Sequence, residues 1–379
     1  MEEIKVFGVF IKNSYQSLLK RNWEFRFSKF NHCLQSWSSR NLSSFYSRIE
    51  VLKIFALSRV FYLAAILPIS KSMVRKFETL IGKFIWKGSG WLMRVAMEEI
   101  KNAPVNGGLG LICVESMCNS LRLSQFLRLL KSSDSKSIAH IDYWIGDSLS
   151  DLLSILDASV HPADIHDYFC DVESLVMAAR FDGYLSPNSW RGLTNKILYT
   201  ENTKAFPEVK VQLDAGAVLN YKMTWARINS PVLRFPVRDI CFMLVHNKLT
   251  TNERLFRIGM RNDPYCVYCP AALICDIEHF FCTCVRVNRI WLKVKTILNS
   301  LIKADVDNWL LINFFMPTSE YENEAVWLIA NYVALVWREL FTCNSEELKE
   351  EEFFGFLTFK FREDRRGSRI IMRDIPNLS

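Results

Sequence analysis

Apolar residues recur every three or four positions along much of the chain, and this spacing predicts helices. Six large apolar side chains follow it between Ser14 and Ser38. The same pattern predicts a helix over 44–67, ended by Pro68, and another that begins at Ser70 or Ser72. Later helices are expected at 115–133, within 236–260, at 284–302, and over 319–345 and 348–362.

Other segments break this pattern. Residues 4–11, IKVFGVFI, have the β-branched and aromatic content of one short strand. NGGLGL (106–111) reads as a turn, and 131–137 as a linker. Residues 138–230 read as short helices broken by Pro162, Pro187 and Pro207. The fold class is therefore mainly α.

Composition changes this picture only modestly. The 379 residues allow two or three domains, and the net charge of +7 is compatible with a polyanionic partner. The start, MEEIKVFGVF, lacks the pattern of a signal peptide, so an intracellular protein of the nucleus or cytoplasm, not secreted, is expected. The apolar stretch 51–69 contains Lys53 and Arg59, which favours a buried helix over a membrane span. We expect no membrane partner.

The segment CVYCPAALICDIEHFFCTC, residues 266–284, holds five cysteines and one histidine. Cys266 and Cys269 form C-x2-C, the turn that points two thiolates at one ion, and His279 follows at finger-like spacing. A structural zinc needs four ligands, which leaves Cys282 and Cys284 competing for the last position, with Cys275 as an outside candidate. Spacing alone does not decide between them. Four protein ligands leave no open position for catalysis.

The pattern C-x2-C-x9-H-x4-C-x6-W resembles the zinc-binding region at the C-terminal end of many non-LTR (LINE-type) retrotransposon reverse transcriptases. In that register Trp291 follows Cys284 by the family spacing. The family usually has a glycine soon after the second cysteine, whereas here Pro270 follows Cys269. The resemblance implies that zinc is held by Cys266, Cys269, His279 and Cys284.

The front of the chain resembles the same family. Residues 4–11 are similar to the strand that closes the palm, and the segment from 14 is similar to the thumb, with Ser47-Arg48-Ile49, FIWKG (84–88) and NGGLGL as shared marks. The closing stretch, residues 353–369, also resembles this family. The resemblance implies four parts: 1–13, palm edge; 14–131, thumb-like helical domain; 132–232, helical connector; 233–379, zinc-binding C-terminal domain.

The parent family is an RNA-directed DNA polymerase, whose phosphoryl transfer needs clustered carboxylates that hold two magnesium ions. This sequence has no Asp-Asp pair, and its first aspartate is Asp134. We therefore expect no catalytic residue and no enzyme activity from this chain alone. The expected protein is the catalytically incomplete C-terminal fragment of a retrotransposon polyprotein.

Basic residues beside aromatic ones suit contact with nucleic acid. The expected partners are RNA and DNA, namely element RNA and target DNA, and no small-molecule substrate is expected. In the alternative, the chain is a zinc-stapled helical interaction protein without a nucleic-acid role. The expected nucleic-acid contacts are Arg48, Lys53, Arg286, Arg289, Lys293, Arg365, Arg366 and Arg369.

Overall fold

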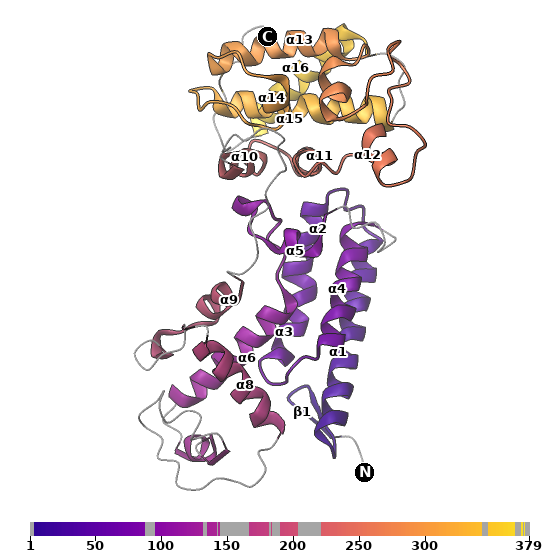
Figure 1. Cartoon of the computed structure of the whole chain (residues 1–379). Coiled ribbons are helices and arrows are strands. Elements are labelled where there is room, and N and C mark those ends of the chain that lie inside the picture. The colour runs from indigo at the N-terminus through magenta and orange to yellow at the C-terminus, as the bar shows by residue number, and fades with distance from the viewer. Residues whose placement is uncertain are drawn as a thin grey trace. The chain divides into compact units, whose positions relative to one another are not determined.

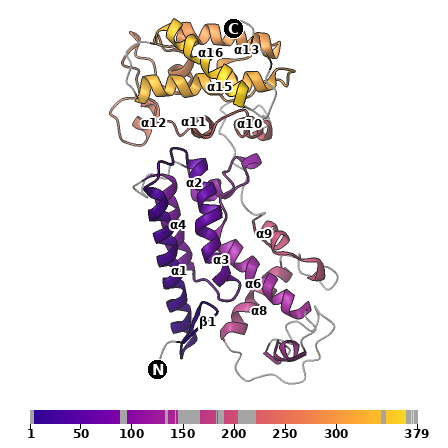
Figure 2. The same cartoon turned by 180° about the vertical axis from the view of Figure 1, so that it is seen from behind.

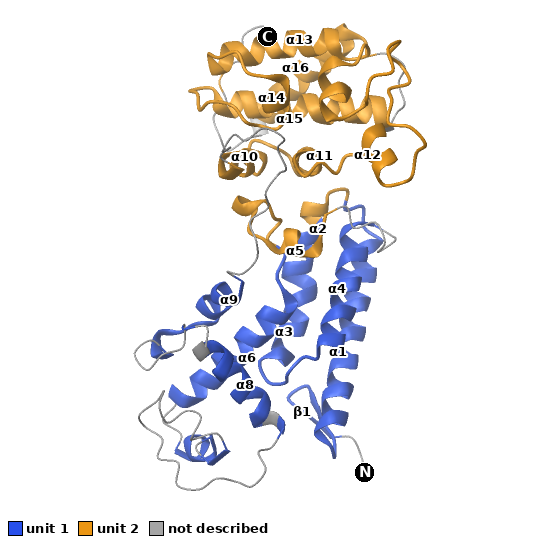
Figure 3. Cartoon of the chain, viewed as in Figure 1, with its two compact units in different colours: residues 1–42, 48–93, 111–207 blue, residues 43–47, 94–110, 208–379 orange. Residues whose placement is uncertain are grey.

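The computed structural model describes residues 4–87, 95–131, 135–141, 143–144, 167–181, 183, 190–203, 221–342, 348–367, 373 and 375. These residues are mainly helical, as the periodicity predicts. Two compact units divide the chain (Figure 3). Unit 1 holds residues 1–42, 48–93 and 111–207, and unit 2 holds residues 43–47, 94–110 and 208–379. The four-part division implied by the resemblance stays a prediction.

The first element differs from the expected single strand. Residues 4–11 form a hairpin in which β1 (Ile4–Val6) pairs antiparallel with β2 (Val9–Ile11). Phe7 and Gly8 between them both have positive φ, 46° and 82°. A two-residue hairpin turn whose central residues both have positive φ matches the right-handed twist of the strands. The prediction of one strand was wrong because the composition of both arms is strand-like and only the Phe7-Gly8 turn separates them.

The predicted first helix is confirmed as α1 (Tyr15–Ser38), with Ser14 accepting a hydrogen bond from the backbone N–H of Ser17 at its start. Such a cap satisfies one of the free N–H groups at a helix N-terminus. The next predicted helix runs as α2 (Phe45–Val51), a π-helical turn η1 (Leu52–Leu57) and α3 (Ser58–Ala64). The third is α4 (Lys71–Ile85), and Ser70, rather than Ser72, caps it.

Aromatic side chains of α1 and α4 form the core of the N-terminal part of unit 1. These two helices run side by side in both views (Figures 1 and 2). Phe77 on α4 has no exposed surface. It makes edge-on ring contacts with Trp23, Phe27 and Phe30 of α1, with centroids 5.0 to 6.4 Å apart. Such edge-to-face packing adds to the stabilisation that burial alone provides.

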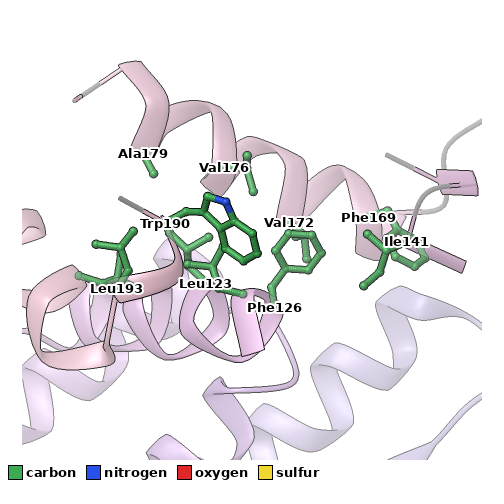
Figure 4. Packing of buried hydrophobic residues seen from close by; sticks show 11 residues of the cluster. Leu123, Phe126, Ile141, Phe169, Val172, Val176, Ala179, Trp190 and Leu193 are labelled. Atoms are coloured by element: carbon green, nitrogen blue, oxygen red, sulfur yellow. The ribbon is translucent and has the colours of Figure 1, made fainter. Parts of the chain in front are cut away.

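A second cluster in unit 1 joins α6 (Val114–Lys131), α8 (Asp167–Phe181), η3 (Trp190–Gly192) and α9 (Asn195–Thr203). Trp190 lies among Leu123, Val172 and Val176 at its centre (Figure 4). Residues 135–141, within the expected linker and connector, are helical and contribute Ile141. Residues 132–134 and the three expected proline breaks lie outside the described residues.

After residues 43–47, unit 2 continues with five short helices. They are α5 (Met97–Lys101), η2 (Pro104–Asn106), α10 (Tyr221–Ile228), α11 (Phe235–Val245) and α12 (Asn252–Arg257). Gly107 and Gly110 in the expected turn have φ of 85° and 63°. The turn therefore uses a backbone conformation that glycine adopts without strain. No helix among the described residues has both the length and the apolar character that a membrane span requires.

The rest of unit 2 is arranged around α15 (Glu322–Trp337), which is buried on nearly all sides. A helix that is apolar all round belongs in a core. It packs against α11, α13 (Asn288–Ile302) and α14 (Asn308–Ile312). The turn η5 (Arg338–Thr342) follows α15, and α16 (Glu350–Gly367) presents Phe353, Leu357 and Phe361 to the core.

Candidate metal centre

The first two cysteines lie in a tight loop between two short extended segments. Tyr265 and Ile274 form an isolated antiparallel bridge. Cys266 donates its N–H to Leu273 O at 2.8 Å, and Cys275 donates to Pro264 O at 2.9 Å. These bonds close the loop at its base, so that Cys266 and Cys269 are held three residues apart on one turn.

His279 and Cys284 are positioned by the π-helical turn η4 (His279–Thr283). His279 begins this turn, and Cys284 is its C-terminal cap. In an α-helix, a residue five positions along lies about 140° around the axis. Here Cys284 instead donates its N–H to His279 O at 2.8 Å, an i to i+5 bond. The wider turn brings Cys284 back to the side of His279. A ligand five residues after His279 requires such a loosening of the helical turn between the two residues.

The ligand atoms of Cys266, Cys269, His279 and Cys284 all lie within 4.8 Å of one another. Cys266 Sγ is 3.8 Å from Cys284 Sγ, and Cys269 Sγ is 3.9 Å from Cys284 Sγ and 3.4 Å from His279 Nε2. Ligands at zinc bond lengths in a tetrahedron place two sulfurs about 3.8 Å apart, and sulfur and nitrogen about 3.6 Å apart. The donor set therefore fits one zinc ion.

The competing cysteines are outside this group. Cys282 has no exposed surface, and burial raises the pKa of its thiol well above the usual range. Cys275 is also buried, and burial raises the pKa of its thiol to about 11. Neither thiol is among the four clustered ligand atoms, so position excludes both from the site. Cys282 on the buried side of η4 is the residue that an α-helical reading of this segment would have chosen.

The electrostatics of the site are those of a cluster built around a cation. Burial lowers the pKa of His279, which keeps the imidazole neutral as a metal ligand must be. Burial raises the pKa of the Cys266 thiol, but hydrogen bonds from the Tyr268 and Cys269 backbones and from the neighbouring thiols lower it further, so its net shift is downward. Burial and the negative charge of Cys266 raise the pKa of Cys284 to about 12. Three thiolates this close need a positive ion between them.

The imidazole of His279 is fixed by its neighbours. Its Nδ1 is 3.1 Å from Thr283 Oγ1, so that Nε2 faces Cys269. Its backbone N–H donates to Asp276 Oδ1 at 2.7 Å. A hydrogen bond on the second ring nitrogen sets the tautomer and orientation of a ligating histidine. Thr283 and Asp276 are supporting residues that the sequence analysis did not single out.

Residues of the unit 2 core form hydrogen bonds to the backbone of η4. Tyr332 on α15 donates its hydroxyl to Phe281 O at 2.5 Å, and Asn288 donates to Cys282 O at 3.1 Å. Trp291, the residue that set the register, is buried against the Tyr332 ring and donates Nε1–H to Asn308 Oδ1 at 2.9 Å. The metal cluster is thus tied to α13, α14 and α15.

Basic residues expected to contact nucleic acid have different surroundings. Arg286 lies over the Tyr268 ring, 3.9 Å from its centroid, and so braces the loop between Cys266 and Cys269. Arg289 and Lys293 on α13 both pair with Glu350 of α16. The side chain of Arg289 is nevertheless 85% exposed.

The remaining expected contacts are scattered. Arg48 is buried and donates to Leu42 O and Ile85 O, which gives it a structural role in unit 1. Lys53 pairs with Glu50 at 2.9 Å. Arg365 is exposed on α16. Arg366 lies on the same helix, and Arg369 lies outside the described residues.

Residues 210–291 match the family model described as zinc-binding in reverse transcriptase. The match contains all four clustered residues and ends at Trp291, and it covers less than a quarter of the chain. No curated protein matches the chain. This part of the molecule is a reverse-transcriptase-associated zinc-binding region, and its Cys3His cluster is a structural zinc site.

Proposed function

We propose that the chain is the nucleic-acid-binding C-terminal region of a LINE-type retrotransposon reverse transcriptase. Zinc held by Cys266, Cys269, His279 and Cys284 orders its C-terminal domain. The observation that carries the proposal is the closed Cys3His cluster within a match to reverse-transcriptase zinc-binding regions. The binding surface is argued from the distribution of charge.

The modest net charge of the chain conceals a strong asymmetry. Residues 4–87 contain fifteen lysines and arginines against three glutamates, a net charge of +12. Residues 88–379 contain 32 basic and 35 acidic residues, a net charge of −3. A basic excess concentrated on a few helices is the electrostatic footprint of a phosphate-backbone partner. The helices α1, α3 and α4 therefore form the main proposed contact surface.

Many of these cations reach the surface. The exposed ones within residues 4–87 are Lys5, Lys20, Lys29, Arg40, Arg59, Lys71, Arg75, Lys76, Lys83 and Lys87. In unit 2, by contrast, Arg289 and Lys293 share a carboxylate partner. Contacts from Arg289 or Lys293 would therefore have to break an ion pair with Glu350.

The zinc in this proposal is structural. Four protein ligands fill a tetrahedral site, so zinc has no open position at which to activate water or a phosphate. Among the described residues, the Cys3His cluster is the one group of three or more closely spaced potential ligands. Polymerisation would be carried out by palm carboxylates that are not part of this site.

The test is a fluorescence anisotropy titration with RNA, duplex DNA and an RNA–DNA hybrid, repeated over a range of salt. Lys71→Gln combined with Lys76→Gln should weaken binding to all three and flatten the salt slope by about 1.5 to 2 units, since two phosphate contacts are lost. Arg289→Gln with Lys293→Gln is the matched control and should change the slope by less. Equal effects of the two double variants, or no binding at low salt, would overturn the proposal.

One observation favours the alternative of an interaction protein. The loop and the segment before it expose apolar side chains, among them Met260 at 66%, Val267 at 66% and Ile274 at 52%. Exposed apolar groups gathered on one region are typical of protein contact sites. If the titration shows no nucleic-acid binding while the zinc stoichiometry holds, this alternative becomes the better explanation.

A further inference from the structure

A cavity of about 380 Å³ lies in unit 1 at the end of α1 and α4. Among the described residues that line it, four are cationic and none is acidic. The cations are Arg40, Arg48, Lys83 and Lys87, and the other lining residues are Trp37, Ser38, Leu42 and Phe84. Four positive groups around one hollow repel each other unless an anion enters. We propose that this hollow, here called the basic pocket, binds clustered phosphate groups.

Two of the arginines are held in place before any ligand arrives. Arg48 is buried and donates to the backbone carbonyls of Leu42 and Ile85, so it forms a fixed part of the wall. Arg40 lies over the Trp37 ring, with its guanidinium carbon 4.3 Å from the ring centroid. Trp37 is itself packed against Phe55 of η1, with centroids 4.9 Å apart. A guanidinium held against an aromatic ring loses less freedom when it binds an oxyanion.

The lysines supply the adaptable part of the pocket. Lys83 lies in the last turn of α4, and Lys87 follows four residues later, just beyond the helix end. Both are exposed. Lys87 has a positive φ of 50°, a backbone conformation uncommon for residues other than glycine, which turns the chain at the helix end. Flexible ammonium groups beside fixed guanidinium groups suit an anion with several oxygens.

The size of the pocket points to more than one phosphate. At about 30 Å³ for each water molecule, 380 Å³ would hold roughly a dozen waters. A diphosphate or triphosphate group, or two successive phosphates of a strand, can enter such a volume. The two sources are therefore a free polyphosphate and a nucleic-acid strand with a phosphorylated end. The inference rests on the proposed function only for the second source.

Isothermal titration of the zinc-loaded full chain with tripolyphosphate tests the pocket directly. Lys83→Gln combined with Lys87→Gln should weaken tripolyphosphate binding roughly tenfold, because two charged hydrogen-bond donors are lost. Lys131→Gln with Lys196→Gln removes the same charge from exposed positions of unit 1 outside the pocket and should change the affinity less than about twofold. Circular dichroism confirms that both variants fold. Equal loss in both, or no binding of tripolyphosphate by the unmodified chain, would overturn the inference.

The source of the phosphate is separated by a second pair of ligands. Oligonucleotides of one sequence, with a 5′-phosphate or a 5′-hydroxyl, are compared in anisotropy titrations. Tighter binding of the phosphorylated strand, lost in the Lys83/Lys87 double variant, identifies a strand end as the ligand. Equal binding of the two strands, with tripolyphosphate affinity intact, identifies a free polyphosphate. This second outcome leaves the pocket standing even if the proposed nucleic-acid function fails.

Discussion

The helices at the front of unit 1 and the metal loop of unit 2 are stabilised in different ways. In the first region, α1 and α4 begin with the serine caps Ser14 and Ser70, and Phe77 is buried among three aromatic rings of α1. The loop from Tyr265 to Cys275 has one isolated bridge, and several of its apolar side chains are exposed. The first region contains its own core, whereas the second depends on a metal to join segments that bury little. Charge follows the same division, because the basic excess lies in the region with its own core.

Removing the metal should have the largest effect. Purified protein should contain about one zinc equivalent, and Cys284→Ser should lose it, because a three-ligand site holds zinc far more weakly. Hydrogen exchange should then show faster exchange around residues 262–291, while α1 and α4 keep their protection. Metal analysis and exchange by mass spectrometry measure both effects.

The matched controls for this variant are Cys275→Ser and Cys282→Ser. Each changes a buried thiol of the same segment that lies outside the cluster, so each should keep the zinc. Loss of zinc from Cys282→Ser and its retention in Cys284→Ser would contradict the ligand set.

A core substitution in unit 1 should have the next largest effect. Phe77→Ala should lower the free energy of unfolding of that unit by about 3–5 kcal/mol, since it leaves a cavity among three rings. The zinc content should not change. Urea denaturation followed by tryptophan fluorescence, with metal analysis of the same sample, measures both. A parallel loss of zinc would show that the two regions are not separately stabilised.

Removing the serine cap of α4 should have the smallest effect. Ser70→Ala removes the side-chain acceptor for the Met73 N–H and should destabilise unit 1 by about 1 kcal/mol. Ser72→Ala, at the alternative start suggested by the sequence, should cost less. The urea midpoints of the two variants give this comparison. A larger effect of Ser72→Ala would contradict Ser70 as the N-cap of α4.

The sequence predicted the helices of unit 1 well because period and caps are local properties. Ser14 and Ser70 stand where the apolar spacing begins, and α1 ends at Ser38 as expected. It missed the Phe7-Gly8 hairpin turn, since nothing else in IKVFGVFI marks a reversal. The π-helical turn η1 within 52–57 was also missed, because a π turn needs no special residue type.

The metal cluster shows the limit of spacing. The residues alone left Cys282 and Cys284 as alternatives, and the resemblance chose Cys284. The structure agrees through a backbone feature, the i to i+5 bond from Cys284 to His279. The supporting contact of Tyr332 comes from α15 and could not be read from local pattern, whereas Thr283 lies in the same turn as His279. Arg48, expected as a nucleic-acid contact, is buried and donates to the backbone carbonyls of Leu42 and Ile85, an environment that local pattern does not indicate.

The π turn at 279–283 also bears on how such a segment can vary between descendants of one gene. The four residues between His279 and Cys284 set the position of the last thiolate by their number, and Thr283 among them also orients the imidazole. Deleting one codon there would leave every ligand in the reading frame yet rotate the last thiolate away from its partners. Exchanging one intervening residue for another would keep the count. Descendants that keep the metal site are therefore expected to keep the length of this segment.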